Sequence, residues 1–361
     1  MRKCRFVKDR CCLNADCPAH GKFSRGNIRV HSFYTTRQGR RRRYLCVTCG
    51  VTFSSTAGTP YYRLKKSRAT FDEVAEMAVE GIGVSSTARI KQCAPNTVAH
   101  WRELAATYAS RFNDNMLNDF ELTELQADEI RTYVHSKSNE VWIMTLLEVS
   151  ARLWVSCLVG RRTFEKVKAV IASALCRGQY SQRILFTSDG LRSYAWAAKT
   201  LLAGLCVYAQ VIKTRCKDRV VRVERKLLLG TQEQLEDALF NSEDSSTINT
   251  SFVERHNLTI RQGSSYLGRR TACHAREQEY LSDNMTLMMC FYNFMRPHSA
   301  LRFGNETRTP AMQAGLVSKR LNFRDVFTSR VIFFLCLIFL AVTQRGNAPY
   351  RVKSGPLITV T

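Results

Sequence analysis

Residues 122–215 carry the clearest pattern of apolar and polar positions in the chain. Residues 125–135 alternate apolar and polar side chains, and residues 141–150 and 152–161 are apolar runs rich in β-branched residues. These patterns predict three successive strands of an antiparallel meander. The pattern then predicts an amphipathic helix over 162–175, a buried strand over 183–190, a helix over 191–204 and a strand over 208–215. Three strands followed by helix, strand, helix and strand is the order of the ribonuclease-H-like α/β fold.

Residues 70–109 show the helical period instead of alternation. Apolar side chains recur at intervals of three and four residues from Phe71 to Ile82, and Thr70 is a suitable cap for this helix. A short helix over 85–92 and a third helix over 97–108 are separated by a tight turn. This arrangement predicts a helix-turn-helix DNA-binding domain.

The third helix would be the recognition helix of that domain. It follows Asn96, a good cap residue, and Thr97, His100 and Arg102 are placed to reach bases or phosphates. Residues 69–125 contain 4 Lys/Arg and 9 Asp/Glu, however, and a plain three-helix packing unit is the alternative that this acidic balance leaves open.

Two close cysteine pairs lie near the N-terminus, with an alternating, strand-like segment and a basic run between them. Cys12 and Cys17 form the first pair, and Cys46 and Cys49 the second. Four thiolates are the ligand set that Zn²⁺ prefers in closed structural sites, so the spacing predicts a zinc ribbon with one ion. The alternatives are free thiols of a reduced compartment, or a site in which Cys11 replaces a ligand. Cys4 and His20 are weaker candidates.

The densest charge in the chain is the run Arg40, Arg41, Arg42 and Arg43, between the cysteine pairs. Most short charge runs are solvated turns. Aromatic neighbours and the expected metal-stabilised hairpin favour a turn that contacts DNA phosphates instead.

Composition supports a polyanion as partner. The chain of 361 residues has a formal net charge of +24, and residues 1–68 alone hold 17 Lys/Arg against 2 Asp/Glu. Such an excess points to nucleic acid or an acidic membrane surface. The first ten residues contain no apolar stretch, so we expect no secretory signal, and the apolar run Val331–Val342 is shorter than the roughly 20 residues of a membrane span.

Three acidic residues stand where metal-dependent catalysis would place them. Asp128 lies in the first expected strand of the meander, Asp189 ends the fourth strand, and Glu254 lies in a segment expected to be helical. The first and fourth strands are neighbours in this fold, so we expect the two aspartates to share one site. Glu129 competes with Asp128, but adjacent strand residues point to opposite faces, so we expect only one of them to face the cleft.

Carboxylates of this kind suit phosphoryl transfer at DNA. Two Mg²⁺ or Mn²⁺ ions held by carboxylates can activate the attacking oxygen and stabilise the leaving one. On a helix, Asn257 and Arg261 would share the face of Glu254, beside the scissile phosphate. The alternatives are an Asp in an ordinary turn and a solvated polar stripe.

Seven segments of the chain, taken in order, resemble the single-frame transposases of the insertion-sequence-one family. They include LQADEIRTYV at 125–134, FTSDGLRSYAWA at 186–197, INTSFVERHNLTIRQGSSYLGRRT at 248–271 and FYNFMRPHSALR at 291–302, and together they extend over roughly residues 10–317. The resemblance implies a DDE transposase, an enzyme whose catalytic acids match Asp128, Asp189 and Glu254. Asn257 and Arg261 match its glutamate-helix signature, and His298 falls in a family-like segment, where it would contact DNA, position a carboxylate or cap the last helix.

The resemblance also implies how the chain is organised and what it binds. We expect a zinc-ribbon module over 1–68, a helix-turn-helix domain over 69–118, a ribonuclease-H-like catalytic domain over 119–317 and a divergent tail over 318–361. The partners would be double-stranded DNA of the element's inverted repeats and of the target, bound by at least a dimer, with no small-molecule substrate and no membrane. We expect a cytoplasmic, nucleoid-associated, prokaryotic protein. The alternative function is a catalytically inactive DNA-binding regulator derived from such a transposase.

The tail is the one departure from the family pattern. About 44 residues follow the segment TPAMQAGL at 309–316, and they show no helix or strand logic after Val331–Val342. Read-through or frameshifted sequence is the favoured interpretation, and a peripheral membrane or oligomerisation helix is the alternative.

Overall fold

The structure, a computed structural model, describes residues 6–217, 219–242, 244–269 and 271–329. Two compact units divide these residues, the first ending at Gly58 and the second running from Thr59 to Ser329. Cys4 and the apolar run Val331–Val342 lie outside the described residues. Of the helices described, none is long and apolar enough to cross a membrane.

The first unit is built on a three-stranded antiparallel sheet. Its strands are β1 (Ile28–Thr36), β2 (Gly39–Cys46) and β3 (Thr52–Ser54), with β2 in the middle. Cys12, Cys17 and Cys46 pack with Ile28 and Tyr44 in the core of this unit. Such a small core buries little apolar surface, so a unit of this size is expected to need a metal for stability.

The arginine run does not form the turn that the sequence predicted. Arg40–Arg43 lies within β2, in register with residues 32–35 of β1, and the chain reverses between Thr36 and Gly39. The reason is that the charged side chains alternate over the two faces of an exposed hairpin, where their stems can lie on aromatic rings.

Three helices open the second unit, as expected: α1 (Arg68–Val79), α2 (Val84–Lys91) and α3 (Pro95–Met116). Their caps differ from the prediction. Ser67, not Thr70, caps α1, because the Ser67 Oγ accepts the backbone N–H of Thr70 at 3.0 Å. Asn96 lies inside the first turn of α3, since Pro95 already occupies the first helical position.

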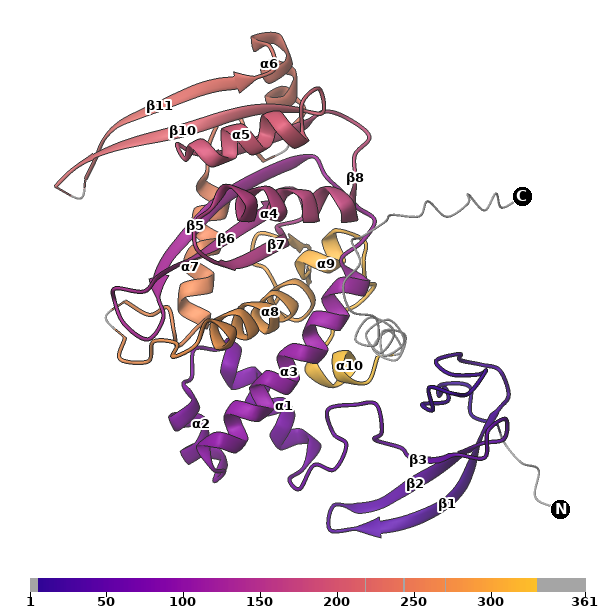
Figure 1. The fold of residues 1–361 in the computed structure, drawn as a ribbon. Helices are drawn as coiled ribbons and strands as arrows, with labels where there is room; N and C mark the ends of the chain where they lie inside the picture. The colour runs from indigo at the N-terminus through magenta and orange to yellow at the C-terminus, as the bar shows by residue number, and fades with distance from the viewer. Residues whose placement is uncertain (1–5, 218, 243, 270, 330–361) are drawn as a thin grey trace, which may run out of the picture. The chain divides into compact units, whose positions relative to one another are not determined.

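A six-stranded mixed sheet forms the centre of this unit (Figure 1). Its strands are β5 (Glu124–Tyr133), β6 (Glu140–Glu148), β7 (Leu153–Gly160), β9 (Ile184–Asp189), β10 (Cys206–Cys216) and β11 (Arg219–Leu229), in the order β11-β10-β9-β5-β6-β7. The predicted meander β5–β6–β7 is confirmed, and β9 runs parallel to both β5 and β10. Strand β11, antiparallel to β10 at the edge, was not predicted.

Helices cover both faces of this sheet. In Figure 1, α4 (Phe164–Arg177) and α5 (Arg192–Leu201) lie in front of it and α7 (Ser251–Gly263) behind it, while α8 (Gln278–Phe294) packs on β7 and α3. Burial on both faces explains why the central strands are almost continuously apolar. The remaining elements are α6 (Gln232–Phe240), α9 (Pro310–Gln313), α10 (Phe323–Phe327), β4 (Phe120–Glu121), β8 (Gly178–Gln179), β12 (Arg302–Phe303) and β13 (Glu306–Thr307).

The end of α1 lies directly against the end of α7. The backbone N–H of Gly81 donates to the carbonyl of Gly263 at 2.9 Å. A Cβ at Gly263 would lie 2.7 Å from the carbonyl oxygen of Val79, and a Cβ at Gly81 would lie 2.8 Å from that of Gln262. Only glycine permits this approach at both positions, so the helical segment and α7 are joined backbone to backbone.

Candidate functional site

The four predicted cysteines come together in the first unit. The Sγ atoms of Cys12 and Cys49 are 3.6 Å apart, those of Cys17 and Cys46 are 3.9 Å apart, and all four lie within 4.8 Å of one another. Each pair sits in a turn closed by a glycine, since Gly21 donates to the carbonyl of Cys12 and Gly50 to that of Cys46. Four close, largely buried thiols can hold one zinc ion.

Local hydrogen bonds prepare one of these thiols for metal binding. Burial opposes ionisation of Cys46, but backbone N–H groups of Cys49 and Thr48 and the amide of Asn27 outweigh it and lower its pKa to about 6. Burial raises the pKa of Cys12. Cys11 and His20 are buried nearby but lie outside the four-thiol group, so neither replaces a ligand.

A second group of metal-ligand type lies at the centre of the sheet. Carboxylate oxygens of Asp128, Glu129 and Asp189 lie within 4.8 Å of one another. The topology explains this proximity: β5 and β9 are parallel neighbours whose pairing ends at Ala127 and Ser188, one residue before each aspartate. Asp189 also accepts the backbone N–H of Leu191 at 3.0 Å, which fixes its position at the strand end.

The presence of Glu129 corrects the expectation that only one of the two adjacent acids faces the cleft. Strand β5 loses its partner β9 after Ala127, so the edge of β5 is open there and both side chains can turn toward Asp189. The Oε1 atom of Glu129 is buried and has no hydrogen-bond partner among the residues that the structure describes. The prediction that Asp128 and Glu129 point to opposite faces of the sheet is therefore wrong.

Burial and mutual repulsion disfavour the ionised forms of these acids. Burial, with the charges of Asp189 and Glu254, raises the pKa of Asp128 to about 6. Burial, with the charges of Asp189 and Asp128, raises the pKa of Glu129 to about 8. A bound cation would offset this penalty, and the three carboxylates are close enough together to hold one.

Glu254 is near this group but outside it. It lies in the first turn of α7, where it pairs with Lys213 of β10 and accepts the hydroxyl of Thr250 at 2.5 Å. Burial raises the pKa of both Asp128 and Asp189, and the charge of Glu254 adds to that rise. The structure therefore brings two of the three predicted acids together and holds the third on Lys213.

Asn257 has a different role from the predicted DNA contact. Its amide donates to Asp128 Oδ2 at 2.9 Å, and its oxygen accepts the hydroxyl of Thr145 at 3.1 Å. Only 7% of the residue is exposed, so it orients Asp128 instead of contacting DNA. Arg261, one helical turn further, is half-buried. Burial and the charge of Arg269 lower its pKa, and the nearby charge of Asp128 partly opposes that lowering.

Two cations beside the acids were missed from the sequence. Lys213 is one, and Arg162 is the other: its guanidinium lies over the ring of Trp142 at 4.0 Å. Burial raises the pKa of Asp189 and Glu129, and the charge of Arg162 offsets part of that rise. Neither belongs to a motif: Lys213 is placed by β10, and Arg162 by the loop between β7 and α4.

The residues predicted on the recognition helix separate into two classes. His100 is exposed and Thr97 half-buried, whereas Arg102 is only 9% exposed. The Arg102 guanidinium donates to the carbonyl of Ile82 at 2.7 Å and to the hydroxyl of Thr87 at 2.8 Å. The prediction that Arg102 reaches DNA is wrong, because it joins α3 to α2.

We expect Arg102→Met to lower the free energy of unfolding by about 1–3 kcal/mol, because it removes a buried charge-assisted contact and leaves its acceptors unpaired. His100→Ala, at an exposed position on the same helix, should change it by less than about 0.5 kcal/mol. Urea denaturation of the full chain, followed in the transition of the second unit, measures both. Equal stability of the two variants would contradict the assigned role of Arg102.

The four arginines of β2 differ in their surroundings. Arg40 lies over the ring of Phe33 at 4.3 Å and Arg43 over that of Tyr34 at 5.8 Å, and both are exposed, as is Arg42. Arg41 is half-buried and donates to the side chain of Gln38 at 2.8 Å. Arg40, Arg42 and Arg43 are therefore available to phosphates, while Arg41 also supports the turn.

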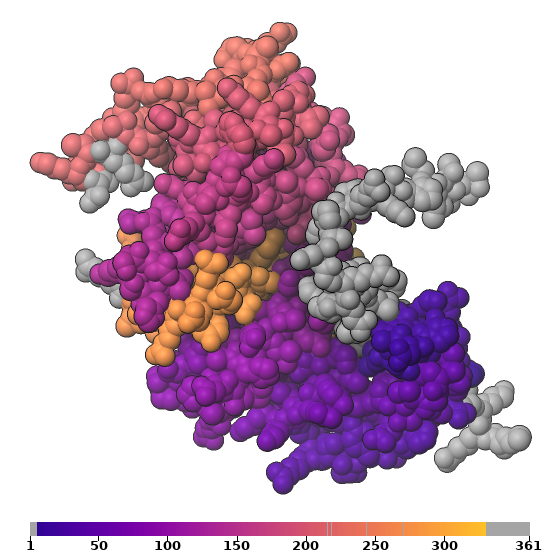
Figure 2. Space-filling model, in the orientation of Figure 1, coloured from indigo at the N-terminus to yellow at the C-terminus, as the bar shows by residue number. Residues whose placement is uncertain are grey.

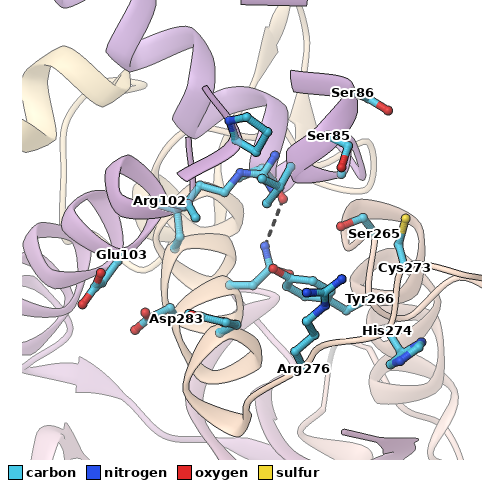
Figure 3. Close-up of a pocket in the computed structure, with 18 of the residues that line it drawn as sticks. Ser85, Ser86, Arg102, Glu103, Ser265, Tyr266, Cys273, His274, Arg276 and Asp283 are labelled. Atoms are coloured by element: carbon cyan, nitrogen blue, oxygen red, sulfur yellow. Dashed lines mark hydrogen bonds between the residues drawn. The ribbon is translucent and has the colours of Figure 1, made fainter. Parts of the chain in front are cut away.

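A cavity of about 450 Å³ lies between α2, the start of α3 and the segment that joins α7 to α8 (Figure 3). Ser85 and Ser86 of α2 line one side, and Tyr266 and Arg276 line another. None of the three clustered carboxylates lines it. The cavity is part of the junction between the helical segment and the sheet domain.

His298 serves the turn after α8. Its Nδ1 accepts the backbone N–H of Ala300 at 3.3 Å, and burial, with the charges of Arg152, Arg296 and Arg255, lowers its pKa to about 4. These contacts favour the structural alternative among its predicted roles.

No protein-family model matches this chain, and no curated protein sequence matches it.

Proposed function

We propose that the chain is a DDE transposase that cleaves 3′ phosphodiesters at the ends of an insertion element and joins them to target DNA. The observation that carries the proposal is the convergence of Asp128 and Asp189 at adjacent ends of parallel strands, with Glu254 on the helix that crosses them. The strand order supports a ribonuclease-H-like domain, because a three-stranded antiparallel meander is followed by two parallel strands on its inner edge.

The donor set fits hard divalent cations such as Mg²⁺ or Mn²⁺. All the candidate ligands are carboxylates, they are partly buried, and their mutual repulsion calls for positive charge. Asp128, Asp189 and either Glu129 or Glu254 would hold two ions. When bound, such ions activate the attacking oxygen and stabilise the leaving oxygen.

The protein's own residues then position the acids and the phosphate. Asn257 and Thr145 hold Asp128 in one orientation. Lys213 pairs with Glu254, and this ion pair would have to open for Glu254 to bind a metal ion. Arg261 and Arg162 would contact the scissile phosphate. Water attacks in the first step and the freed 3′-OH in the second, so the oxygen of the leaving strand departs each time and no covalent bond to protein is needed.

Recognition of the element ends is assigned to the other elements. Arg40, Arg42 and Arg43 on the zinc-ribbon hairpin would contact phosphates, while Thr97 and His100 on α3 would read bases. Cleavage and joining of two ends require two active sites, which supports a dimer or a larger oligomer. The resemblance to the insertion-sequence-one family supports each of these assignments.

The deciding experiment incubates the full chain with Mg²⁺ and a duplex that carries the inverted repeats flanking its reading frame. We expect 3′ nicking at the repeat end and joining to a second duplex, and neither with scrambled repeats. Binding without nicking would favour the inactive regulator. Nicking without joining would favour a structure-specific nuclease of the same fold.

The raised pKa values of these acids predict that the stabilisation of the protein by bound Mg²⁺ depends on pH. The pKa of Asp128 is raised to about 6 and that of Glu129 to about 8, so their contribution to the stability of the metal-free protein falls as pH rises through these values. A cation competes with those protons. The Mg²⁺-induced rise in Tm should therefore be larger at pH 8 than at pH 6, and nearly absent in Asp128→Asn. An equal rise at both pH values would contradict this picture.

A further inference from the structure

The β10–β11 hairpin projects from the body of the second unit, as Figures 1 and 2 show. Nearly all side chains of β11 are exposed or half-buried, including Val220, Val221 and Val223, which are 47%, 62% and 41% exposed. The first half of this 11-residue strand buries no side chains, so packing against a hydrophobic core does not account for its length.

The hairpin is strongly basic. Between Lys213 and Lys226 the sequence holds seven Lys/Arg and two Asp/Glu. One of the acids, Glu224, is already bridged by Arg222 at 2.8 Å and by Lys226 at 3.3 Å. The exposed surface thus keeps a positive excess that needs a negative partner.

The base of the hairpin adjoins the acidic site. Val211 of β10 is in register with Asp189, and Lys213, two residues further, pairs with Glu254. From Val211 to Cys216 the strand extends about 17 Å at roughly 3.4 Å per residue. This length corresponds to about five base pairs of a duplex lying alongside.

We propose that the surface formed by Lys217, Arg219, Arg222 and Lys226 is a contact for the phosphate backbone of duplex DNA that extends away from the acidic site. The inference rests on the proposed function in one respect: DNA held at the acids would continue along the hairpin. Charge selects DNA over a second copy of the chain, since pairing two such edges would bring their arginines and lysines together.

The test neutralises two cations near the hairpin end, Lys217→Gln with Arg219→Gln, in the full chain. The control removes two exposed cations elsewhere, Lys199→Gln with Lys319→Gln. Binding to a duplex of random sequence is measured without divalent metal over a range of salt concentrations. We expect the slope of log K against log salt to fall by about 2 in the hairpin variant and to stay unchanged in the control.

The outcomes separate this inference from the proposed function. An unchanged salt slope in the hairpin variant overturns the DNA contact, whether or not the wild-type chain cleaves DNA. A reduced slope supports it, even if no cleavage is ever found. Loss of self-association in sedimentation, with an unchanged slope, would instead assign the surface to a second copy of the chain.

Discussion

Asp128→Asn and Asp189→Asn should each lower the rate of Mg²⁺-dependent cleavage of element-end DNA by about three orders of magnitude. Each substitution removes one anionic ligand from the centre of the site, and a loss of several kilocalories per mole in transition-state stabilisation corresponds to a reduction of this size. Single-turnover nicking of labelled duplex measures the effect. DNA binding and Tm serve as controls, because a neutral isostere should preserve the fold.

The same assay distinguishes the two candidates for the remaining ligand. If Glu254 leaves Lys213 to join the site, Glu254→Gln should match the aspartate variants and Glu129→Gln should retain most activity. If Glu129 is the ligand in the position seen here, the order reverses. Full cleavage by Asp189→Asn would overturn the assignment of the whole site.

Removal of zinc should unfold the first unit. Metal–thiolate binding contributes about 10–16 kcal/mol in small zinc domains, far more than a core of this size can supply. We expect a strong chelator, or Cys46→Ser, to abolish the protease resistance of the region before Gly58 and to leave the unit Thr59–Ser329 folded. The intact chain should contain one zinc per molecule.

Cys11→Ser is the matched control for this prediction. Cys11 is buried beside Cys12 but does not belong to the four-thiol group, so its replacement should retain the metal. Loss of zinc on Cys11→Ser, with retention on Cys46→Ser, would show that the ligand set has been assigned wrongly. Unchanged protease resistance of the metal-free chain would show that zinc does not stabilise the first unit.

Much of the fold follows from patterns that act over a few residues. Alternation over 125–135 and two apolar, β-branched runs predicted the three-stranded meander, and the helical period predicted α1 to α3, because burial dictates those patterns. The four-cysteine site could also be predicted from the sequence, since tetrahedral metal binding favours cysteines in close pairs. The proximity of Asp128 and Asp189 could be predicted because parallel strand order fixes it once the fold class is known.

What the sequence could not supply depends on register and on competition between partners. Lys213 and Arg162 reach the acids from distant strands and loops, and no local pattern marks them. Arg102 was predicted to bind DNA because it lies near the start of the expected recognition helix. Its guanidinium instead donates to the carbonyl of Ile82 and the hydroxyl of Thr87. The arginines of β2 looked like a turn because charge runs usually interrupt strands, whereas here aromatic rings of β1 accommodate them.

The glycine contact between Gly81 and Gly263 has a mechanical consequence. It joins the end of α1, which packs on α2 and α3, to α7, the helix that carries Glu254 and Asn257. If the proposed function holds, the distance from the base pairs contacted by α3 to the phosphate at the acids would be fixed by this contact. The cut would fall at a constant number of base pairs from the recognised sequence, whatever bases lie in between.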